Sequence, residues 1–444
     1  MKNLLTLFAE KKFYKTIFVF IITAVFGVTG VTALSAQDRV LHKNTLSDSS
    51  VVSMVTVYPG NKIYSLFGHS AFRVYDPENK IDLMYNYGTF DFTDSFFVLR
   101  FIEGKLDYYL DIGSFSSAYR FYSNIEKRKI FEQILNFDLK KRQALFDFLE
   151  ENGKPENRIY RYDFIWDNCS TRIAGAIDKT FPDLVDFSAY KGSGESFRKM
   201  IMHYLGEKPF TNFGIQLVLG KSTDRIPIGH ELFFLPIYMK QAFSAAVIKN
   251  KEGAPIPLVA KEAMIASPEL VFHKKSNYPF FIFLSVLIIY FVSLVLQFGK
   301  NGKNVLVNLS NKNTFVFKMS GTVSALCEGF VFLFAGIIGL LITYLWFFSE
   351  HRVASSNLNF FWCTPLNLIL FVGMFLKKKK NLKKLSLFFS CLSLVILVFC
   401  AAYLVCVIFG MQYVHPAFVP IIIFLIAANI RRLEIKCCFK FKTA

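Results

Sequence analysis

The sequence predicts a membrane protein in which an α+β soluble domain is followed by an α-helical transmembrane bundle of about five helices. Hydrophobic residues make up 53% of the 444 residues and include 52 phenylalanines, more than a soluble chain of this length normally carries. These residues concentrate near the N-terminus and after Pro279, and the stretch between them resembles an ordinary globular sequence. Within that stretch, strand-like and helix-like segments are segregated rather than strictly alternating, which favours an α+β fold.

Residues 1–36 are predicted to be a signal peptide or an N-terminal membrane anchor. A basic stretch precedes an apolar run that ends in the small residues Ala33-Leu34-Ser35-Ala36. This order is typical of a signal peptide cleaved before Gln37, and an uncleaved anchor is the open alternative. Either segment would send the following residues across the membrane.

Residues 37–277 are predicted to form one soluble domain, since their number suits a single core. Alternating apolar residues predict strands at Val51–Tyr58, Ser70–Tyr75 and Ile81–Tyr87. From about Phe131 to Glu151 the apolar spacing predicts helices, with Asp138 as the cap of a second one and Asn152-Gly153 as its end. A further helix is expected to begin near Asn168.

Residues 278–444 are predicted to form the transmembrane helical domain. Apolar runs of about the length that crosses a bilayer occur at roughly 279–299, 327–348, 358–376, 385–409 and 413–430. The loops alternate in charge: 300–325, 377–384 and the C-terminal tail are rich in Lys and Arg, whereas 349–357 and 410–412 are poor in them. Because basic loops stay in the cytoplasm, the soluble domain is expected on the outer side of the inner membrane.

The formal net charge of +18 does not indicate a nucleic-acid-binding protein. The basic residues cluster at the ends of the apolar runs, as in Lys377-Lys378-Lys379-Lys380 and Arg431-Arg432. Cations at such positions orient helices and meet anionic lipid head groups. We therefore expect no nucleic-acid partner.

The soluble segment contains a single cysteine, Cys169, whereas the other seven lie in or beside the C-terminal helices. A lone cysteine cannot form a disulfide within its domain, so Cys169 is either an inert buried thiol or a chemical one. Asn168 or Asp167 is a natural N-cap, which would place Cys169 in the first turn of a helix. Free backbone N–H groups and the helix dipole favour a thiolate there, and a small core cysteine beside a cap is the alternative.

A thiol nucleophile needs a base, and His69 is one of five candidate histidines in this segment. His69 stands at the start of a predicted strand, after Gly68, which leaves room beside the imidazole. The other four are His42, His203, His230 and His273. Chemistry alone does not choose among them.

The soluble segment contains an ordered series of motifs: Gly68-His69-Ser70-Ala71-Phe72-Arg73-Val74-Tyr75-Asp76-Pro77, Tyr85-Asn86-Tyr87-Gly88-Thr89-Phe90-Asp91-Phe92, Pro155-Glu156-Asn157-Arg158, Tyr160-Arg161-Tyr162-Asp163-Phe164 and Asn168-Cys169-Ser170-Thr171-Arg172. This series resembles the Lnb-type lipoprotein N-acyltransferases of bacteria. The similarity continues in Phe213-Gly214, Leu219-Gly220 and Asp224, and in the membrane part in His351, Asn357-Leu358-Asn359, Trp362 and Pro365-Leu366. The resemblance therefore covers most of the chain.

The order of His before Cys in this family resembles circularly permuted papain-like folds, relatives of NlpC/P60. The resemblance implies that Cys169 is the nucleophile and His69 the base, with Asp82 or Asn86 on the next strand orienting the imidazole. It implies transfer of an acyl chain from a membrane phospholipid, through a thioester, to the amine of a diacylglyceryl-cysteine at a lipoprotein N-terminus. No metal or soluble cofactor is expected.

Four further residues are candidate substrate contacts. Arg172 is either a phosphate clamp for the donor lipid or a solvated helix residue. Asn168, Tyr87 and His351 complete the set, and helix capping, sheet packing and a polar loop cap are the respective alternatives. Two rival functions are an NlpC/P60-like amidase or endopeptidase acting on cell-wall peptides and a non-catalytic envelope scaffold.

Overall fold

A computed structural model describes residues 45–90, 97–249, 253–268, 277–298, 314–376 and 383–440. The predicted N-terminal segment 1–36 lies outside these residues. The chain divides into two compact units. We call Met1–Leu205 with Arg225–Lys274 the sheet unit, and Gly206–Asp224 with Lys275–Ala444 the helical unit.

The sheet unit is built on a seven-stranded antiparallel sheet with strand order β10-β5-β1-β2-β3-β4-β6. Its strands are β1 (Val51–Val57), β2 (His69–Asp76), β3 (Ile81–Thr89), β4 (Asp107–Ser114), β5 (Ile130–Leu135), β6 (Ile159–Arg161) and β10 (Val259–Ala266). A second, three-stranded sheet contains β7 (Val185–Asp186), β8 (Val247–Ile248) and β9 (Ile256–Pro257). Strands β1 and β2 stand at the centre of the larger sheet, so β2 is held by neighbours on both sides.

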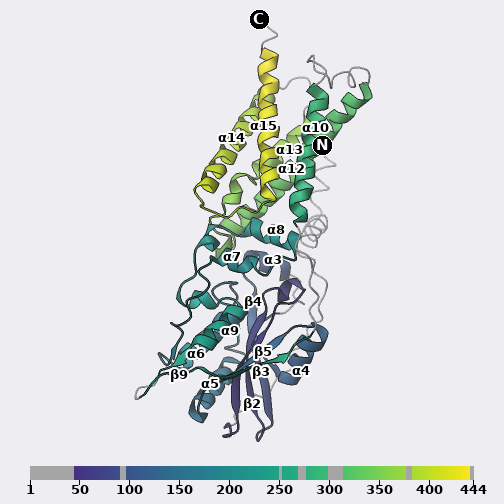
Figure 1. Ribbon diagram of the computed structural model, residues 1–444. Coiled ribbons are helices and arrows are strands. Elements are labelled where there is room, and N and C mark those ends of the chain that lie inside the picture. The colour runs from purple at the N-terminus through teal and green to yellow at the C-terminus, as the bar shows by residue number, and fades with distance from the viewer. Residues whose placement is uncertain are drawn as a thin grey trace. The chain divides into compact units, whose positions relative to one another are not determined.

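The helices of the sheet unit connect and cover these strands (Figure 1). They are α3 (Phe97–Glu103), α4 (Phe115–Arg120), α5 (Leu139–Asn152), α6 (Cys169–Thr180), α7 (Phe197–Met202) and α9 (Pro236–Ala245). Short 3₁₀ turns lie at η1 (Ile63–Ser65) and η4 (Gly229–Phe233), and η2 (Phe121–Ile125) is a single π-helical turn. Such π turns are rare and often occur at functional sites.

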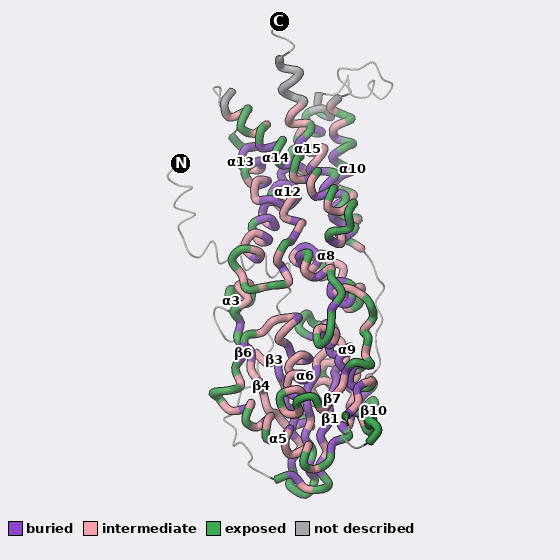
Figure 2. The backbone as a smooth tube through the Cα atoms, turned by 90° about the vertical axis from the view of Figure 1, so that its left-hand side faces the viewer, coloured by how far each residue is buried: buried purple, intermediate pink, exposed green. Residues whose placement is uncertain are grey.

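The sheet buries a different apolar cluster on each face because side chains alternate along a strand. Phe72 and Val74 of β2 belong to the larger cluster, which includes residues of α5, α6 and α9. Ala71, which precedes Phe72, belongs to a smaller cluster that contains Phe115 of α4. Figure 2 shows the buried residues concentrated along the strands and the helices against them. The alternation therefore brings α6 against the Phe72 side of β2.

One sequence prediction for this unit is wrong. Residues 130–135 form strand β5, not the first of two helices, and they pair with both β1 and β10. The apolar spacing in so short a segment fits either period, and the two neighbouring strands decide it. The second helix is confirmed: Asp138 caps α5 by accepting from the Lys141 N–H at 2.9 Å, and Gly153 follows its last residue.

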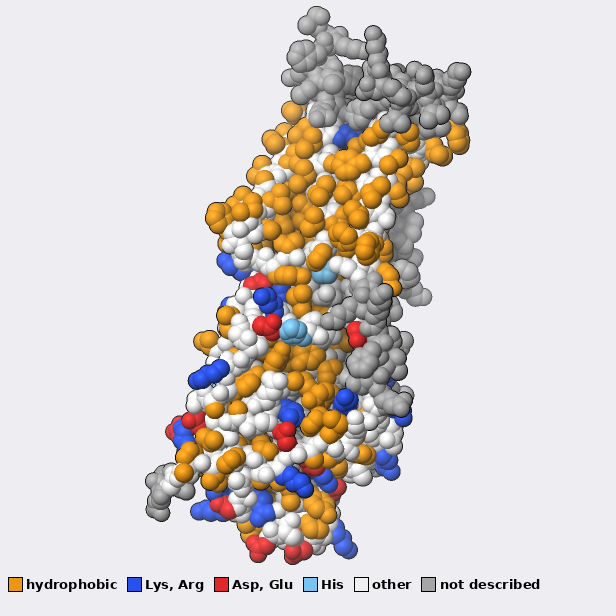
Figure 3. Space-filling model, in the orientation of Figure 1, with side chains coloured by type: hydrophobic (Ala, Val, Ile, Leu, Met, Phe, Trp, Pro, Cys, Tyr) orange, Lys and Arg blue, Asp and Glu red, His pale blue; other side chains and the backbone are white. Residues whose placement is uncertain are grey.

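The helical unit contains the long apolar helices of the chain. Its elements are α8 (Pro209–Val218), η3 (Lys221–Asp224), α10 (Tyr278–Phe298), α12 (Thr314–Phe347), η5 (Arg352–Ala354), η6 (Leu358–Phe361), α13 (Leu366–Leu376), α14 (Lys383–Ile408) and α15 (Phe418–Lys440). On the face that Figure 3 shows, apolar side chains cover the outside of these helices. An apolar exterior is what a lipid environment requires.

Four segments of the described chain are long and apolar enough to cross a membrane: 278–297, 318–347, 358–376 and 385–408. They correspond to four of the expected spans, although α12 begins well before residue 327 and the third span is a 3₁₀ turn followed by α13. Pro365 separates these two pieces, as a residue without an N–H does. The fifth expected span, 413–430, falls in α15, which is not among the four.

Residues 206–224 pack with the membrane helices, although they lie far from them in sequence. Asn357 and Asn359 each donate a side-chain N–H to the Leu217 carbonyl at the end of α8, at 2.7 and 3.2 Å. The Gly220 N–H donates to the Val353 carbonyl at 2.8 Å. We call these contacts the α8 clamp. These contacts join the motifs around Leu219-Gly220 to those around Asn357-Leu358-Asn359.

Candidate active site

Strand β2 begins at His69 because a glycine precedes it. Gly68 has a φ of +87°, and a Cβ at this position would lie 2.8 Å from the Val57 carbonyl oxygen. A side chain would therefore strain the backbone and collide with β1. The turn sets His69 opposite Val57 in the ladder, with its side chain only partly buried.

Helix α6 begins at Cys169 because Asn168 caps it. The Asn168 side-chain oxygen accepts from the N–H groups of Ser170 and Thr171 at 2.8 and 3.1 Å. Its amide donates to the carbonyls of Phe164 and Phe234 at 2.7 and 2.8 Å. Asn168 is 3% exposed. The predicted cap is confirmed, and these contacts correspond to the capping alternative for Asn168 rather than to a substrate contact.

The starts of α6 and β2 lie against each other. Ser70 Oγ and Ser170 Oγ are 3.3 Å apart, although a hundred positions separate the two residues. The backbone N–H of Ser70 also hydrogen-bonds the Cys169 thiol. Gly88 of β3 faces the same thiol-bearing residue, since a Cβ there would lie 3.6 Å from the Cys169 Cβ. The residues adjoining His69 and Cys169 are thus in contact, as the resemblance implies.

The surroundings favour the neutral forms of both groups at rest. Burial, and then the charge of Arg128, lower the pKa of His69 to about 4. Burial raises the pKa of the Cys169 thiol, against hydrogen bonds from Ser70 and Ser170 that favour the thiolate. A neutral imidazole can accept a proton, so His69 is available as a base for the thiol during attack, although its lowered pKa makes it a weaker base than an ordinary histidine.

Of the two residues expected to orient His69, the structure brings Asn86 to it. Asn86 Oδ1 lies 3.2 Å from His69 Nε2. Asp82, further along β3, instead pairs with Arg73, at 2.7 Å between Asp82 Oδ1 and Arg73 Nε and 3.1 Å between Asp82 Oδ2 and Arg73 Nη2. In the ladder Asp82 is opposite Tyr75, at the other end of β2 from His69.

Tyr87 and Arg172 are both engaged within the chain. Tyr87 is 2% exposed in the larger apolar cluster and donates its hydroxyl to Asn152 at 2.7 Å, which is the sheet-packing alternative. Arg172 Nη2 pairs with Asp167 Oδ2 at 2.6 Å, and its guanidinium lies 3.9 Å from the Tyr160 ring centre. Arg172 therefore braces the turn that precedes Cys169.

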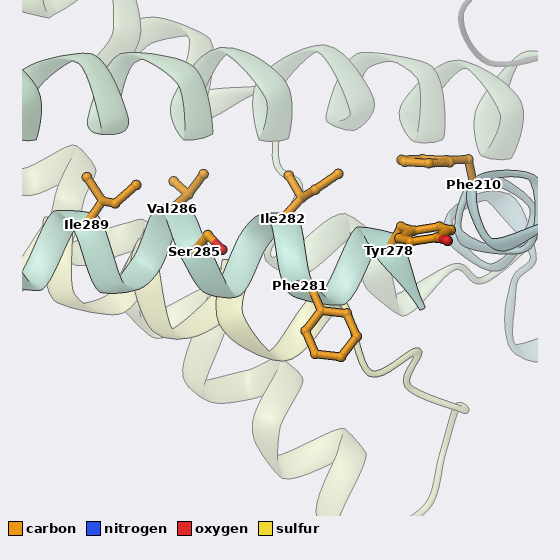
Figure 4. A pocket seen from close by; sticks show the side chains of 7 residues that line it. All are labelled: Phe210, Tyr278, Phe281, Ile282, Ser285, Val286 and Ile289. Atoms are coloured by element: carbon orange, nitrogen blue, oxygen red, sulfur yellow. The ribbon is translucent and has the colours of Figure 1, made fainter. Parts of the chain in front are cut away.

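His351 lies in the helical unit, where it precedes η5. Its carbonyl accepts from the Ala354 N–H at 3.0 Å, and its side chain is partly buried. The helical unit also has an open apolar groove of about 640 Å³ along α10 (Figure 4). Phe210 and Tyr278 stand at one end, and Ile282, Val286 and Ile289 follow along the helix. Its lining suits lipid chains rather than polar ligands.

Sequence reasoning missed three residues behind His69. The Tyr122 ring centre is 6.1 Å from that of His69, and the Arg128 guanidinium is 5.2 Å from the Tyr122 ring centre. Arg128 Nη1 pairs with Glu126 Oε2 at 2.8 Å, with 3% of each side chain exposed. No local motif marks them, because η2 reaches His69 only through the fold of the sheet. Within the described ranges, no group of three or more His, Cys, Asp and Glu residues could hold a metal.

Two family comparisons match this chain. The Lnb N-terminal periplasmic domain matches residues 36–192, which include His69 and Cys169. The Lnb transmembrane domain matches residues 312–437, which include α12 to α15. The chain belongs to the Lnb family. It is a membrane protein with a periplasmic domain, which lies in the sheet unit.

Neither the curated proteins nor the solved structures contain a match to the chain. Helices α7, α8 and α9, and α10 with its groove, lie between the two matched ranges. The family matches therefore say nothing about these elements, and only the structure describes their contacts.

Proposed function

We propose that this Lnb-family protein is a lipoprotein N-acyltransferase of the inner membrane, with a permuted papain-like periplasmic domain. Cys169 is the nucleophile, His69 its base and Asn86 the residue that orients the imidazole. The observation that carries the proposal is the contact between the start of α6 and the start of β2, through Ser70 and Ser170. Membership of the family adds the membrane context.

The first half-reaction transfers an acyl chain to the enzyme. His69 takes the thiol proton as the Cys169 sulfur attacks an ester carbonyl of a phospholipid. The ester C–O bond then breaks, and the imidazolium returns the proton to the departing lysophospholipid oxygen. A thioester on Cys169 remains.

The second half-reaction uses the α-amine of a diacylglyceryl-cysteine. The amine nitrogen attacks the thioester carbonyl, the C–S bond breaks and an amide forms. The proton lost by the amine passes through His69 to the Cys169 sulfur, which restores the resting pair. Both substrates are lipids, so a multi-pass membrane anchor allows the enzyme to meet them without extracting them into water.

Backbone N–H groups beside the sulfur can hold the negative oxygen that develops in each step. Those of Ser70 and Cys169 lie beside the thiol and favour its ionised form, whereas that of Ser170 is already donated to Asn168. One such donor is typically worth about 3–4 kcal/mol of transition-state stabilisation. Asn168 keeps them in place by fixing the first turn of α6.

The test is mass spectrometry of a mature lipoprotein N-terminus from cells that carry Cys169→Ser as their only copy. The amide-linked acyl chain should disappear while the diacylglyceryl group remains. Cys391→Ser is a matched control, because Cys391 is an exposed thiol on α14. Unchanged N-acylation in Cys169→Ser cells would reject the proposal, and a changed cell-wall peptide profile with intact N-acylation would favour a hydrolase.

A further inference from the structure

Two surface turns that are far apart in sequence meet beside the candidate site. The Tyr64 hydroxyl of η1 donates to Glu126 Oε1 at 2.6 Å, and Lys62 Nζ lies 4.0 Å from the same oxygen. Glu126 directly follows η2, whose last residue is Ile125. The turns at 62–64 and 125–127 therefore form one continuous surface.

This surface combines apolar side chains with basic ones. Ile63, Tyr64 and Ile125 are large apolar residues that are 38%, 41% and 70% exposed. Lys62 and Lys127 flank them and are also exposed. We call these five residues the rim patch.

The acid within this surface does not neutralise the patch. Glu126 has 3% of its side chain exposed and pairs with the equally buried Arg128. The two charges of that pair cancel, so the exposed part of the surface keeps the charge of Lys62 and Lys127. Its sign favours an anionic partner.

A series of three side chains, Glu126, Arg128 and Tyr122, connects the rim patch to His69. Arg128, the ion-pair partner of Glu126, lies over the Tyr122 ring, and that ring is the neighbour of the imidazole. A ligand on the patch would therefore be connected to His69 through these side chains.

We propose that the rim patch binds the anionic phospholipid surface of the membrane and so holds the mouth of the His69–Cys169 site at the lipid head groups. Tyr and Ile side chains enter the head-group region, and lysines beside them bind lipid phosphates. The inference deepens the proposed function, since it names anionic phospholipid as the surface from which that function takes its donor.

The experiment uses the full-length protein in nanodiscs of phosphatidylcholine with increasing phosphatidylglycerol. A fluorophore sensitive to polarity replaces Ile125 by amber suppression, so binding is read without any turnover. Its emission should shift to the blue as the phosphatidylglycerol fraction rises, and high salt should reverse the shift. Each lysine should contribute roughly fivefold to binding, so Lys62→Glu/Lys127→Glu should weaken the response by more than tenfold.

Lys140→Glu/Lys179→Glu is the matched control. Both lysines are exposed in the sheet unit, and the double change alters the net charge equally. The control should retain the response to phosphatidylglycerol. An emission at position 125 that ignores lipid composition, or that responds only to an added lipoprotein peptide, would overturn the inference. Because this readout needs no active enzyme, it remains decisive if Cys169→Ser leaves N-acylation unchanged.

Discussion

Burial raises the pKa of the Cys169 thiol and lowers the pKa of the His69 imidazole, so the two values move further apart. The thiol becomes harder to ionise and the imidazole harder to protonate. Both groups are therefore neutral at rest, and in the proposed mechanism the thiolate forms only as the proton moves to His69 during attack. Activity then depends on His69 staying unprotonated.

The pH dependence follows from the pKa of His69. Because that pKa lies near 4 rather than at the ordinary 6.5, kcat/KM should stay level as the pH falls through 6.5 and decline only toward pH 4. The unfolded chain binds this proton more readily than the folded one, so protonation below pH 6.5 also favours unfolding. A pH profile with its acid limb at 6.5 would contradict this account; stability should be recorded at each pH as the control.

Asn86 and Asp82 make a direct comparison of an orienting residue with a structural one. Asn86→Ala should lower kcat by roughly tenfold or more with little change in KM, because the imidazole loses its partner on β3. Asp82→Ala should leave kcat near that of the wild type and lower the melting temperature, because Arg73 loses an ion-pair partner. Steady-state kinetics and thermal unfolding of both variants decide between them. Equal losses of kcat would refute the assignment.

The chemistry at this scale was partly predictable. The motif resemblance selected His69 and Cys169, and the next strand offered both Asn86 and Asp82. Only the ladder register decided between these two, because it sets Asp82 opposite Tyr75 at the far end of β2. Tyr122, which neighbours His69, and Arg128, which lies over the Tyr122 ring, could not be predicted, since their positions depend on tertiary folding that brings η2 beside the start of β2.

At the scale of elements, two glycines at the ends of strands lie beside the candidate site residues His69 and Cys169. Gly68 and Gly88 both have positive φ values, +87° and +94°. The first turns the chain into β2, and the second lies beside Cys169. Both glycines belong to the motifs noted in the sequence, and the structure shows that each has a left-handed backbone conformation.

Gly68→Ala should destabilise the periplasmic domain, whereas Gly175→Ala should not. At Gly68 a Cβ meets the Val57 carbonyl and the left-handed backbone disfavours alanine, so a loss of about 1–3 kcal/mol is expected. At Gly175, inside α6, a Cβ meets nothing within 4 Å, so alanine should stabilise by about 0.5–1 kcal/mol. Chemical denaturation of the two variants measures both effects. A neutral Gly68→Ala would contradict the strained turn.

Capping signals predicted elements better than apolar spacing did. Asp138 and Asn168 marked the starts of α5 and α6 correctly. The spacing within 131–135 suggested a helix, yet the segment pairs as a strand with β1 and β10. A cap is a local hydrogen bond and is visible in sequence, whereas the choice between helix and strand in a short apolar run is made by distant neighbours.

At the scale of the whole molecule, the chain leaves the sheet unit at residue 205 and returns to it at 225. The intervening segment belongs to the helical unit and is fixed by the α8 clamp. The family-like motifs at 213–224 and 351–366 are thus explained by their mutual contacts. Both groups of motifs resemble the same family in sequence. The sequence could not show that they contact each other, because that contact is tertiary.

The α8 clamp should open when Gly220 is replaced. A Cβ at Gly220 would lie 1.9 Å from the Ser355 carbonyl oxygen, so Gly220→Ala should separate the two backbones. Hydrogen exchange at residues 209–218, measured in detergent or nanodiscs, should then rise strongly. Gly321→Ala is the control, because a Cβ there meets nothing within 4 Å. Unchanged protection of α8 in Gly220→Ala would contradict the clamp.

The most direct test of the central claim is detection of the acyl-enzyme. The purified protein should be incubated with phospholipid in the absence of a lipoprotein acceptor, and its peptides examined by mass spectrometry. The account predicts one acyl chain on the Cys169 peptide, released by neutral hydroxylamine as a thioester is, and absent in His69→Ala. An enzyme that N-acylates lipoproteins while Cys169 never carries an acyl chain would contradict it.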